Sequence, residues 1–248
     1  MSVAFVTLLE RKILGLSQLR KGPNKVSLAG IFQPFSDAIK LFIKENLTPS
    51  LAGLRLFILR PALRISIMLM IFITVPFNEQ LFRSSLSIVL IYTLLRLNVY
   101  PVLVAGWTSN SGYALIGGLR RVAQTISYEV SLALVFLFFF ALMGRLSTFD
   151  SVLQGPLGTK AYAFLPIVGI WLISCLAETN RTPFDFAEGE SELVSGFNVE
   201  YGSLGFAVIF IAEYGIILFI SLLFSYIFIG AGITAAPLYL AVGAISSA

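Results

Sequence analysis

The segment from Leu176 to Tyr201 concentrates carboxylates in an otherwise apolar chain. It holds six of the 13 acidic residues and a single basic residue, Arg181. Large apolar side chains alternate with these acids, which favours a segment packed against protein over a solvated loop. Crowding and partial burial raise carboxyl pKa values, and groups that titrate near neutrality can pass protons on. The six acids are Glu178, Asp185, Glu188, Glu190, Glu192 and Glu200.

Two further acids, Glu129 and Glu213, lie inside apolar runs. At 1.5 Å per residue, each lies very roughly 10 to 14 Å from the inner end of its expected helix. Acids inside a membrane are costly and normally face protein or water, so we expect a functional role for both. Arg60, Arg64 and Arg96 also lie in apolar runs, and we interpret them as structural ion pairs or snorkelling ends whose partners the sequence does not identify.

The elements that must position these residues are membrane helices. The 248 residues are 57% hydrophobic and 12% charged, and the apolar runs of about 20 residues match a ~30 Å hydrocarbon layer. We predict an all-α, polytopic fold with one membrane domain, 1–248. About six spanning segments are expected. They comprise an incomplete first helix at 1–9 and spans near 56–77, 86–107, 122–143, 161–177 and 204–229, followed by a tail at 231–248 that contains an incomplete helix.

A shorter helix is predicted from Pro34 to Glu45. Phe35, Ala38, Ile39 and Phe42 follow the i, i+3, i+4, i+7 spacing, while polar residues occupy the other face. Twelve residues make only ~18 Å of helix, too short to span a bilayer. We therefore expect an interfacial amphipathic helix.

The basic residues predict the orientation in the membrane. Most of them fall in the loops 10–53, 108–121 and 178–203, which the positive-inside rule assigns to the inner side. The acidic segment lies on that same side. Because the basic residues flank apolar runs, membrane topology explains the net charge of +4 better than nucleic-acid binding does.

The composition also limits the redox chemistry. The chain has no histidine and one cysteine, Cys175, so we expect no haem, iron-sulfur cluster, zinc site or disulfide on it. No glycine-rich dinucleotide or phosphate motif is present. Any electron transfer must use cofactors on other chains.

Five stretches of the chain resemble the family of subunit 1 of NADH:ubiquinone oxidoreductase, respiratory complex I, in its mitochondrial form. The similarity extends over about residues 4–230, and the acidic segment is its most specific part. The stretches are 9–15 (LERKILG), 18–24 (QLRKGPN), 106–107 (GW), 123–130 (AQTISYEV) and 176–201.

The resemblance implies a subunit that joins the membrane arm to the hydrophilic arm. With two hydrophilic-arm subunits it would build the chamber where ubiquinone approaches the last iron-sulfur cluster. Residues matching the quinone chamber are Arg11, Arg20, Phe35 and Asp37. Residues matching a proton relay from the chamber toward the membrane arm are Glu129, Glu178, Asp185, Glu188, Glu190, Glu192, Glu200 and Glu213, with Arg181 beside them.

The same resemblance implies partners and a location. Ubiquinone is the expected substrate, with no covalently bound cofactor, and FMN and iron-sulfur clusters are expected on partner subunits. The chain would act as one subunit of the proton-translocating NADH dehydrogenase of the respiratory chain, among other membrane-arm and hydrophilic-arm subunits, membrane lipid and no nucleic acid. It would be multi-pass in the mitochondrial inner membrane, with its acidic and basic loops on the matrix side.

Some features of the chain depart from the family pattern. Family members are usually longer at both ends, so the chain is either a fragment or a shortened subunit. Arg60, Arg64, Arg96 and Arg121 stand where the family more often has uncharged residues, and we assign them no role. The residues also fit two other functions. A proton-coupled secondary transporter also uses intramembrane acids. A structural adaptor could dock the hydrophilic arm through the acidic segment.

Overall fold

The computed structural model describes residues 2–46, 53–74, 87–143, 165–186, 198 and 200–224. Within these ranges every regular element is a helix, which confirms the all-α prediction. The tail at 231–248 lies outside the described residues. The elements are α1 (Ser2–Ser17), the 3-10 turn η1 (Leu28–Gly30), α2 (Gln33–Ile43), α3 (Leu54–Ile73), α4 (Ser87–Leu97), α5 (Val99–Thr108), α6 (Gly112–Met143), α7 (Leu165–Thr179) and α9 (Ser203–Phe224).

The chain is a polytopic helical membrane protein. Among the described residues, four stretches are long and apolar enough to cross a bilayer: Leu54–Ile73, Val89–Thr108, Gly112–Phe138 and Ser203–Phe224. The second stretch runs through α4 and α5 together. The 15 residues of α7 are apolar but extend only about 22 Å.

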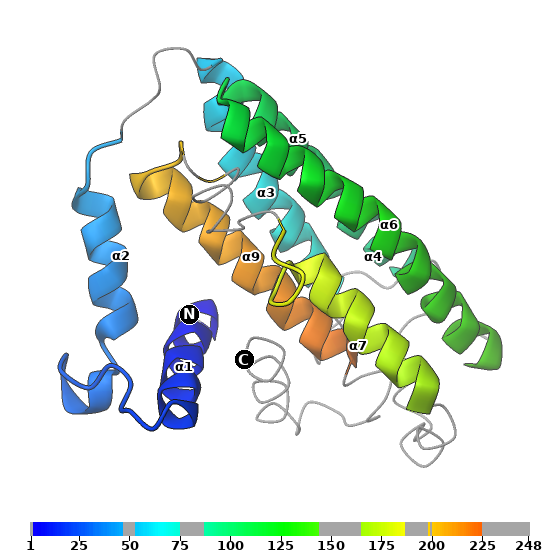
Figure 1. Cartoon of the computed structure of the whole chain (residues 1–248), viewed down its shortest axis with the longest axis horizontal. Helices are drawn as coiled ribbons and strands as arrows, with labels where there is room; N and C mark the ends of the chain where they lie inside the picture. Colours follow the sequence, from blue (N-terminus) through cyan, green and yellow to red (C-terminus); the bar gives the residue numbers. More distant parts are fainter. Residues whose placement is uncertain are drawn as a thin grey trace.

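Figure 1 shows α9 between two groups of helices. On one side it contacts α3 and α7, which with α5 and α6 form the main bundle, and on the other side it contacts α1 and α2. The core of the bundle includes Ile71, Trp171 and Phe219, all nearly inaccessible to solvent. The rings of Phe136 and Trp171 pack edge to face there, joining α6 to α7.

Several helix ends lie together at one end of the bundle. The Gly53 N–H at the start of α3 donates to the Thr108 carbonyl at the end of α5, at 3.1 Å. Gly106 lies so close to α6 that a Cβ atom on it would be 3.0 Å from the Ala114 carbonyl oxygen. The starts of α3 and α6 and the end of α5 are therefore neighbours, and the polar residues near them can meet.

Helix boundaries differ from the prediction in three places. The first helix continues past residue 10 to Ser17, and α6 begins at Gly112, inside the expected loop 108–121. Lysine, arginine and leucine are all good helix formers, so charged residues mark where a helix leaves the apolar layer, not where it ends. The expected single helix at 86–107 is divided at Asn98 into α4 and α5.

The amphipathic helix is confirmed as α2, with a proline in its first turn. Its apolar side chains Ile39, Phe42 and Ile43 are exposed on the chain's surface. An exposed apolar face of this kind is normally covered by membrane lipid or by another protein. Its depth in a membrane remains a prediction.

Candidate functional site

Glu213 is held between three helices. Its Oε1 atom lies 3.0 Å from Nη2 of Arg64 on α3 and 3.2 Å from Nη1 of Arg121 on α6. All three side chains are largely or fully removed from solvent. Because charges in an apolar medium must be paired, this triad joins α3, α6 and α9 at one point. The interpretation of Arg64 as part of an ion pair is confirmed.

The inward face of α6 carries a row of polar residues. Arg121, Gln124 and Glu129 are buried on this face, while Ile126 and Val130 are exposed on the opposite face. The pattern is the reverse of a soluble amphipathic helix, because in a membrane protein the outer face meets lipid. The helix thus turns Glu129 toward α4, Gln124 toward α7 and Arg121 toward α9.

Gln124 fixes the chain that follows α7. Its Nε2 atom donates to the Ala177 carbonyl at 3.0 Å and to the Phe184 carbonyl at 2.8 Å. Asn180, in the left-handed region with φ of 50°, turns its amide oxygen to accept from Arg121 at 2.8 and 2.9 Å. These contacts hold the start of the acidic segment against α6.

Two further carboxylates, Glu129 and Glu178, are buried between α6 and α7. Glu129 pairs with Arg96 on α4 at 2.9 Å, although the Arg96 side chain is 58% exposed. Glu178 lies within electrostatic range of Glu129, Arg121 and Arg64. Its Oε2 atom is buried without a hydrogen-bond partner, and no ion pair between described residues includes it. Arg64 and Arg121, which pair with Glu213, also act on Glu178, so these arginines link Glu213, Glu178 and Glu129 into a series across α9, α7 and α6.

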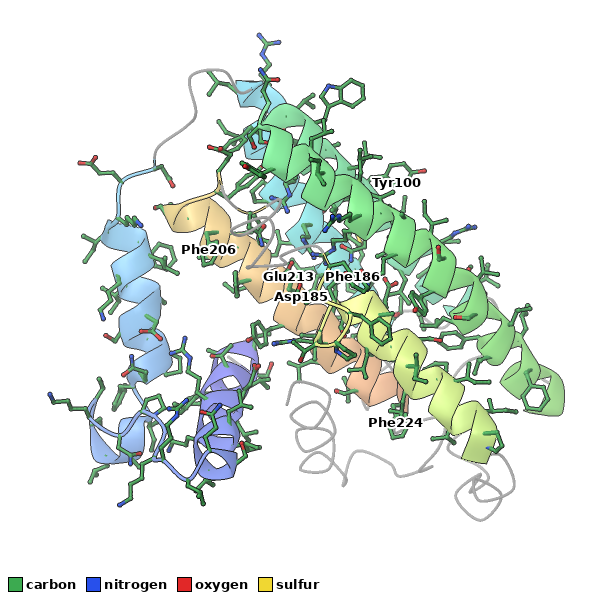
Figure 2. The ribbon with its side chains drawn as sticks, in the orientation of Figure 1. Tyr100, Asp185, Phe186, Phe206, Glu213 and Phe224 are labelled. Atoms are coloured by element: carbon green, nitrogen blue, oxygen red, sulfur yellow. The ribbon has the colours of Figure 1, made fainter. Side chains whose placement is uncertain are left out.

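A cavity of about 300 Å³ lies at one end of this series. Figure 2 shows Asp185 and Glu213 close together where the chain after α7 crosses α9, and both line the cavity. Its lining combines three acids, two arginines and an aromatic patch. The lining residues are Glu10, Leu14, Arg121, Thr179, Asn180, Arg181, Thr182, Asp185, Phe210, Glu213, Tyr214 and Ile217.

Arg181 connects the cavity to α1. Its two Nη atoms lie 2.9 and 3.4 Å from the carboxylate oxygens of Glu10, and its guanidinium lies 4.9 Å from the ring centre of Tyr214. Burial alone would lower the pKa of Arg181, but Tyr214 and Glu10 outweigh that effect and raise it above the ordinary arginine value. Arg181 therefore remains a fixed cation at any physiological pH.

Three of the four quinone-chamber candidates lie together on α1 and α2. Arg11 Nη1 contacts Asp37 Oδ2 at 2.8 Å, and Gln33 supports the other carboxylate oxygen at 2.9 Å. Phe35 packs between Phe5 and Phe32, with ring centres 6.2 and 6.1 Å away.

The fourth chamber candidate, Arg20, is placed by a turn in the chain after α1. Its Nε atom donates to Gln18 Oε1 at 2.8 Å, and its side chain is exposed. Gly15 and Gly22 bring this turn against α1, because a Cβ on Gly15 would lie 2.9 Å from the Gly22 nitrogen. Arg20 is therefore not part of the Arg11 and Asp37 pair.

The structure thus brings together four of the eight relay candidates, with Arg181 beside them. Glu200 is half-buried just before α9 and does not line the cavity. Glu188, Glu190 and Glu192 lie outside the described residues. The four that meet are Glu129, Glu178, Asp185 and Glu213.

Sequence reasoning missed several members of the site. Glu10, Arg121 and Asn180 line the cavity and Gln124 holds the chain after α7, and none of the four was assigned a role. The spacing of Arg121, Gln124, Tyr128 and Glu129 along one helix face could have identified the α6 row. Glu10 and Asn180 gave no such signal, because their contacts join distant parts of the chain.

No metal site accompanies these acids in the part of the chain that the structure describes. No group of three or more histidine, cysteine, aspartate or glutamate side chains is arranged to hold a metal ion there. The carboxylates instead face arginines, tyrosine and amide groups, an arrangement that can hold and exchange protons.

The chain is similar to one family over nearly its whole length. A family model described as NADH dehydrogenase matches residues 1–245. The chain is 54% identical over 231 residues to NADH-ubiquinone oxidoreductase chain 1 of Aedes aegypti, covering 93% of this chain and 74% of that protein. It is 52% identical over 244 residues to the same chain of Anopheles gambiae, covering 98% and 78%. The lamprey Lampetra fluviatilis protein of that name is 47% identical over 235 residues, covering 93% and 72%.

Proposed function

The chain belongs to the NADH dehydrogenase family, and from this membership we propose that it lines a ubiquinone cavity and couples quinone reduction to proton movement. Its relatives are subunits of NADH-ubiquinone oxidoreductase, so it is a membrane subunit of that mitochondrial complex. In the proposal, FMN and iron-sulfur clusters reside on partner subunits, and residues 10–53, 108–121 and 178–203 face the matrix.

The buried series of acids carries this proposal. Glu213 lies on the cavity, and Glu178 and Glu129 follow it through the bundle. Carboxylates inside a membrane are costly, and proton relays are one of the few functions that require them. Glu178 supports the relay most directly, because a buried carboxyl oxygen without a hydrogen-bond partner is free to take up a proton.

The quinone side of the proposal rests on aromatic surfaces. Phe206, Phe210 and Tyr214 form a row along α9, with successive ring centres 4.3 and 6.3 Å apart. Phe210 and Tyr214 belong to the cavity lining. A row of rings that ends at polar groups suits a flat quinone head with an isoprenoid tail.

The proposed chemistry divides the work between chains. Reducing a quinone to a quinol requires electrons, which a centre on a partner subunit supplies, and protons, which must reach the quinone oxygens. Asp185 lies on the cavity and could pass these protons on, with Arg181 fixing the local positive charge, while Arg64 and Arg121 hold Glu213 as a carboxylate. A change of charge at the quinone head would alter the field at Glu213 and, through Arg64 and Arg121, the field at Glu178 and then at Glu129, so the acids would respond in turn.

Glu178→Gln tests the relay with the least structural disturbance. The amide has nearly the same shape and leaves no described ion-pair partner without its counter-charge. Glu45→Gln, an identical change at an exposed acid, is the matched control. We expect NADH–quinone activity and proton pumping in reconstituted vesicles to fall at least tenfold for Glu178→Gln and to be unchanged for Glu45→Gln.

The outcomes separate the proposal from its rivals. Full activity and pumping in Glu178→Gln would reject the relay role of this acid. Normal turnover per complex with fewer assembled complexes would instead support a structural adaptor. Proton-coupled solute uptake by the isolated chain in liposomes would support a secondary transporter.

A further inference from the structure

The chain between the acidic segment and α9 is anchored to α3. Pro61 lies inside α3 and has no N–H, so the Phe57 carbonyl four residues earlier loses its helical partner. The Tyr201 hydroxyl donates to that carbonyl at 3.4 Å. The rings of Tyr201 and Phe57 stack with centres 4.1 Å apart and planes 6° from parallel.

A second anchor, two residues later, reaches α2. Ser203 begins α9 with φ of 53° and is 1% exposed. Its Oγ atom lies 2.6 Å from the Lys44 carbonyl oxygen and 3.1 Å from the Leu41 carbonyl oxygen. The Ser203 hydroxyl therefore donates its hydrogen to carbonyls at the C-terminal end of α2. Carbonyls in the last turn of a helix have no partner within the helix and must find one elsewhere.

We propose that Ser203 is a positioning residue that fixes the C-terminal turn of α2 against the start of α9. The helix α2 contributes Asp37 and Phe35 at its beginning, and its exposed apolar face carries Ile39, Phe42 and Ile43. Glu213 lies ten residues beyond Ser203, about 15 Å along the same helix. Ser203 thus holds α2, which carries the exposed apolar face, at a fixed position relative to α9, which carries Glu213.

The backbone at Ser203 supports a role for the hydroxyl itself. A non-glycine residue with φ of 53° is strained, and glycine or asparagine is normally favoured there. A serine kept in this conformation directs its hydroxyl at α2. The consequence for quinone rests on the proposed function, which places the quinone along the aromatic row of α9, and extends it: the tail of a long quinone continues onto the exposed apolar face of α2. Loosening α2 then weakens the binding of long-tailed quinones more than that of short-tailed ones.

Hydrogen–deuterium exchange of the assembled complex tests the anchor. Ser203→Ala removes the hydroxyl, and Ser203→Gly removes it while relieving the strained backbone. If the hydroxyl holds α2, amides in the second half of α2 exchange roughly three- to ten-fold faster in both variants, the effect of one lost hydrogen bond. Ser66→Ala is the matched control, because Ser66 bonds only within its own helix. Unchanged exchange in α2 in both variants would overturn the proposal.

Kinetics test the consequence, with a ten-isoprene and a one-isoprene ubiquinone as probes. We expect KM for the long quinone to rise roughly three- to ten-fold in Ser203→Ala, with kcat and the short-quinone KM unchanged. Ser203→Cys, which keeps a weak donor, should recover part of the loss. An equal rise for both quinones would overturn the positioning role. Glu178→Gln is tested by activity and proton pumping, and Ser203→Ala by hydrogen exchange in α2. A failure of the proposed relay can therefore be distinguished from a failure of the anchor.

Discussion

Arginine and carboxylate meet at nearly the same distance in two regions, with different surroundings. Between α1 and α2, Arg11 and Asp37 lie 2.8 Å apart with side chains 55% and 34% exposed. Within the bundle, Arg64 and Glu213 lie 3.0 Å apart with side chains 0% and 18% exposed. Contact distance is therefore almost constant, while access to water differs greatly.

This difference decides what each pair can do. An exposed pair is screened by water and salt and contributes little to stability. A buried pair costs much desolvation, and removal of one partner leaves an unpaired charge in an apolar medium. The pair between α1 and α2 can thus separate to admit a ligand at a small cost in free energy. The pair within the bundle stays closed unless one of its members changes protonation or the charge of a neighbouring group changes.

Glu213→Leu should have the largest effect. It leaves Arg64 and Arg121 without their carboxylate, and we expect destabilisation of about 3 to 5 kcal/mol. Native gels should show strongly reduced assembled complex. Combining it with Arg64→Leu and Arg121→Leu should restore assembly without restoring coupled activity. Normal assembly of the single variant would contradict the contrast between the two regions.

Gln124→Leu should have the next largest effect. It removes the side-chain donor that the Ala177 and Phe184 carbonyls share. The Ala177 carbonyl keeps the Asn180 N–H at 3.4 Å, so most of the cost of about 1 to 3 kcal/mol comes from the Phe184 carbonyl. We expect faster hydrogen exchange in residues 177–186 and lower quinone reductase activity. Ser127→Ala on the exposed face of α6 is the control, since its hydroxyl bonds only to Ala123. Equal exchange in both variants would show that Gln124 does not hold this segment.

Tyr201→Phe tests a buried hydroxyl that donates to the Phe57 carbonyl, on a ring that lies 4.4 Å from the Arg60 guanidinium. Loss of the hydroxyl should cost about 0.5 to 1.5 kcal/mol in thermal unfolding of the complex. In a Pro61→Ala background the new N–H can bond the Phe57 carbonyl, so the same change should cost less. A double-mutant cycle measures this coupling. Additive effects would mean that the proline does not create the acceptor for Tyr201.

Arg11→Gln should have the smallest effect on stability, about 0 to 1 kcal/mol. The same change should raise the apparent KM for ubiquinone, because Arg11 is proposed to line the chamber. Raising the ionic strength should weaken the Arg11 contribution and leave that of Glu213 nearly unaltered. An unchanged KM would remove Arg11 from the quinone site, and a stability loss matching that of Glu213→Leu would remove the distinction between exposed and buried pairs.

The sequence by itself determined the helical membrane fold, the amphipathic helix and the family. These properties depend on local composition, on a 3.6-residue period and on long stretches of matching residues, all of which are present along the chain. It also identified Glu129 and Glu213, because an acid in an apolar run stands out without any knowledge of its neighbours, and Glu178 as a member of the acidic segment. Their roles as proton carriers remain a prediction.

Only the tertiary structure decided which groups meet. Glu10 and Arg181 are far apart in sequence, as are Arg64 and Glu213, and no periodicity links them. The same holds for Ser203, whose partner is the end of α2. A charge inside a membrane must be neutralised, and the sequence shows which charged residues lie in apolar runs and therefore need a partner. The choice of partner depends on how helices from distant parts of the chain pack, and that is a property of the assembled bundle.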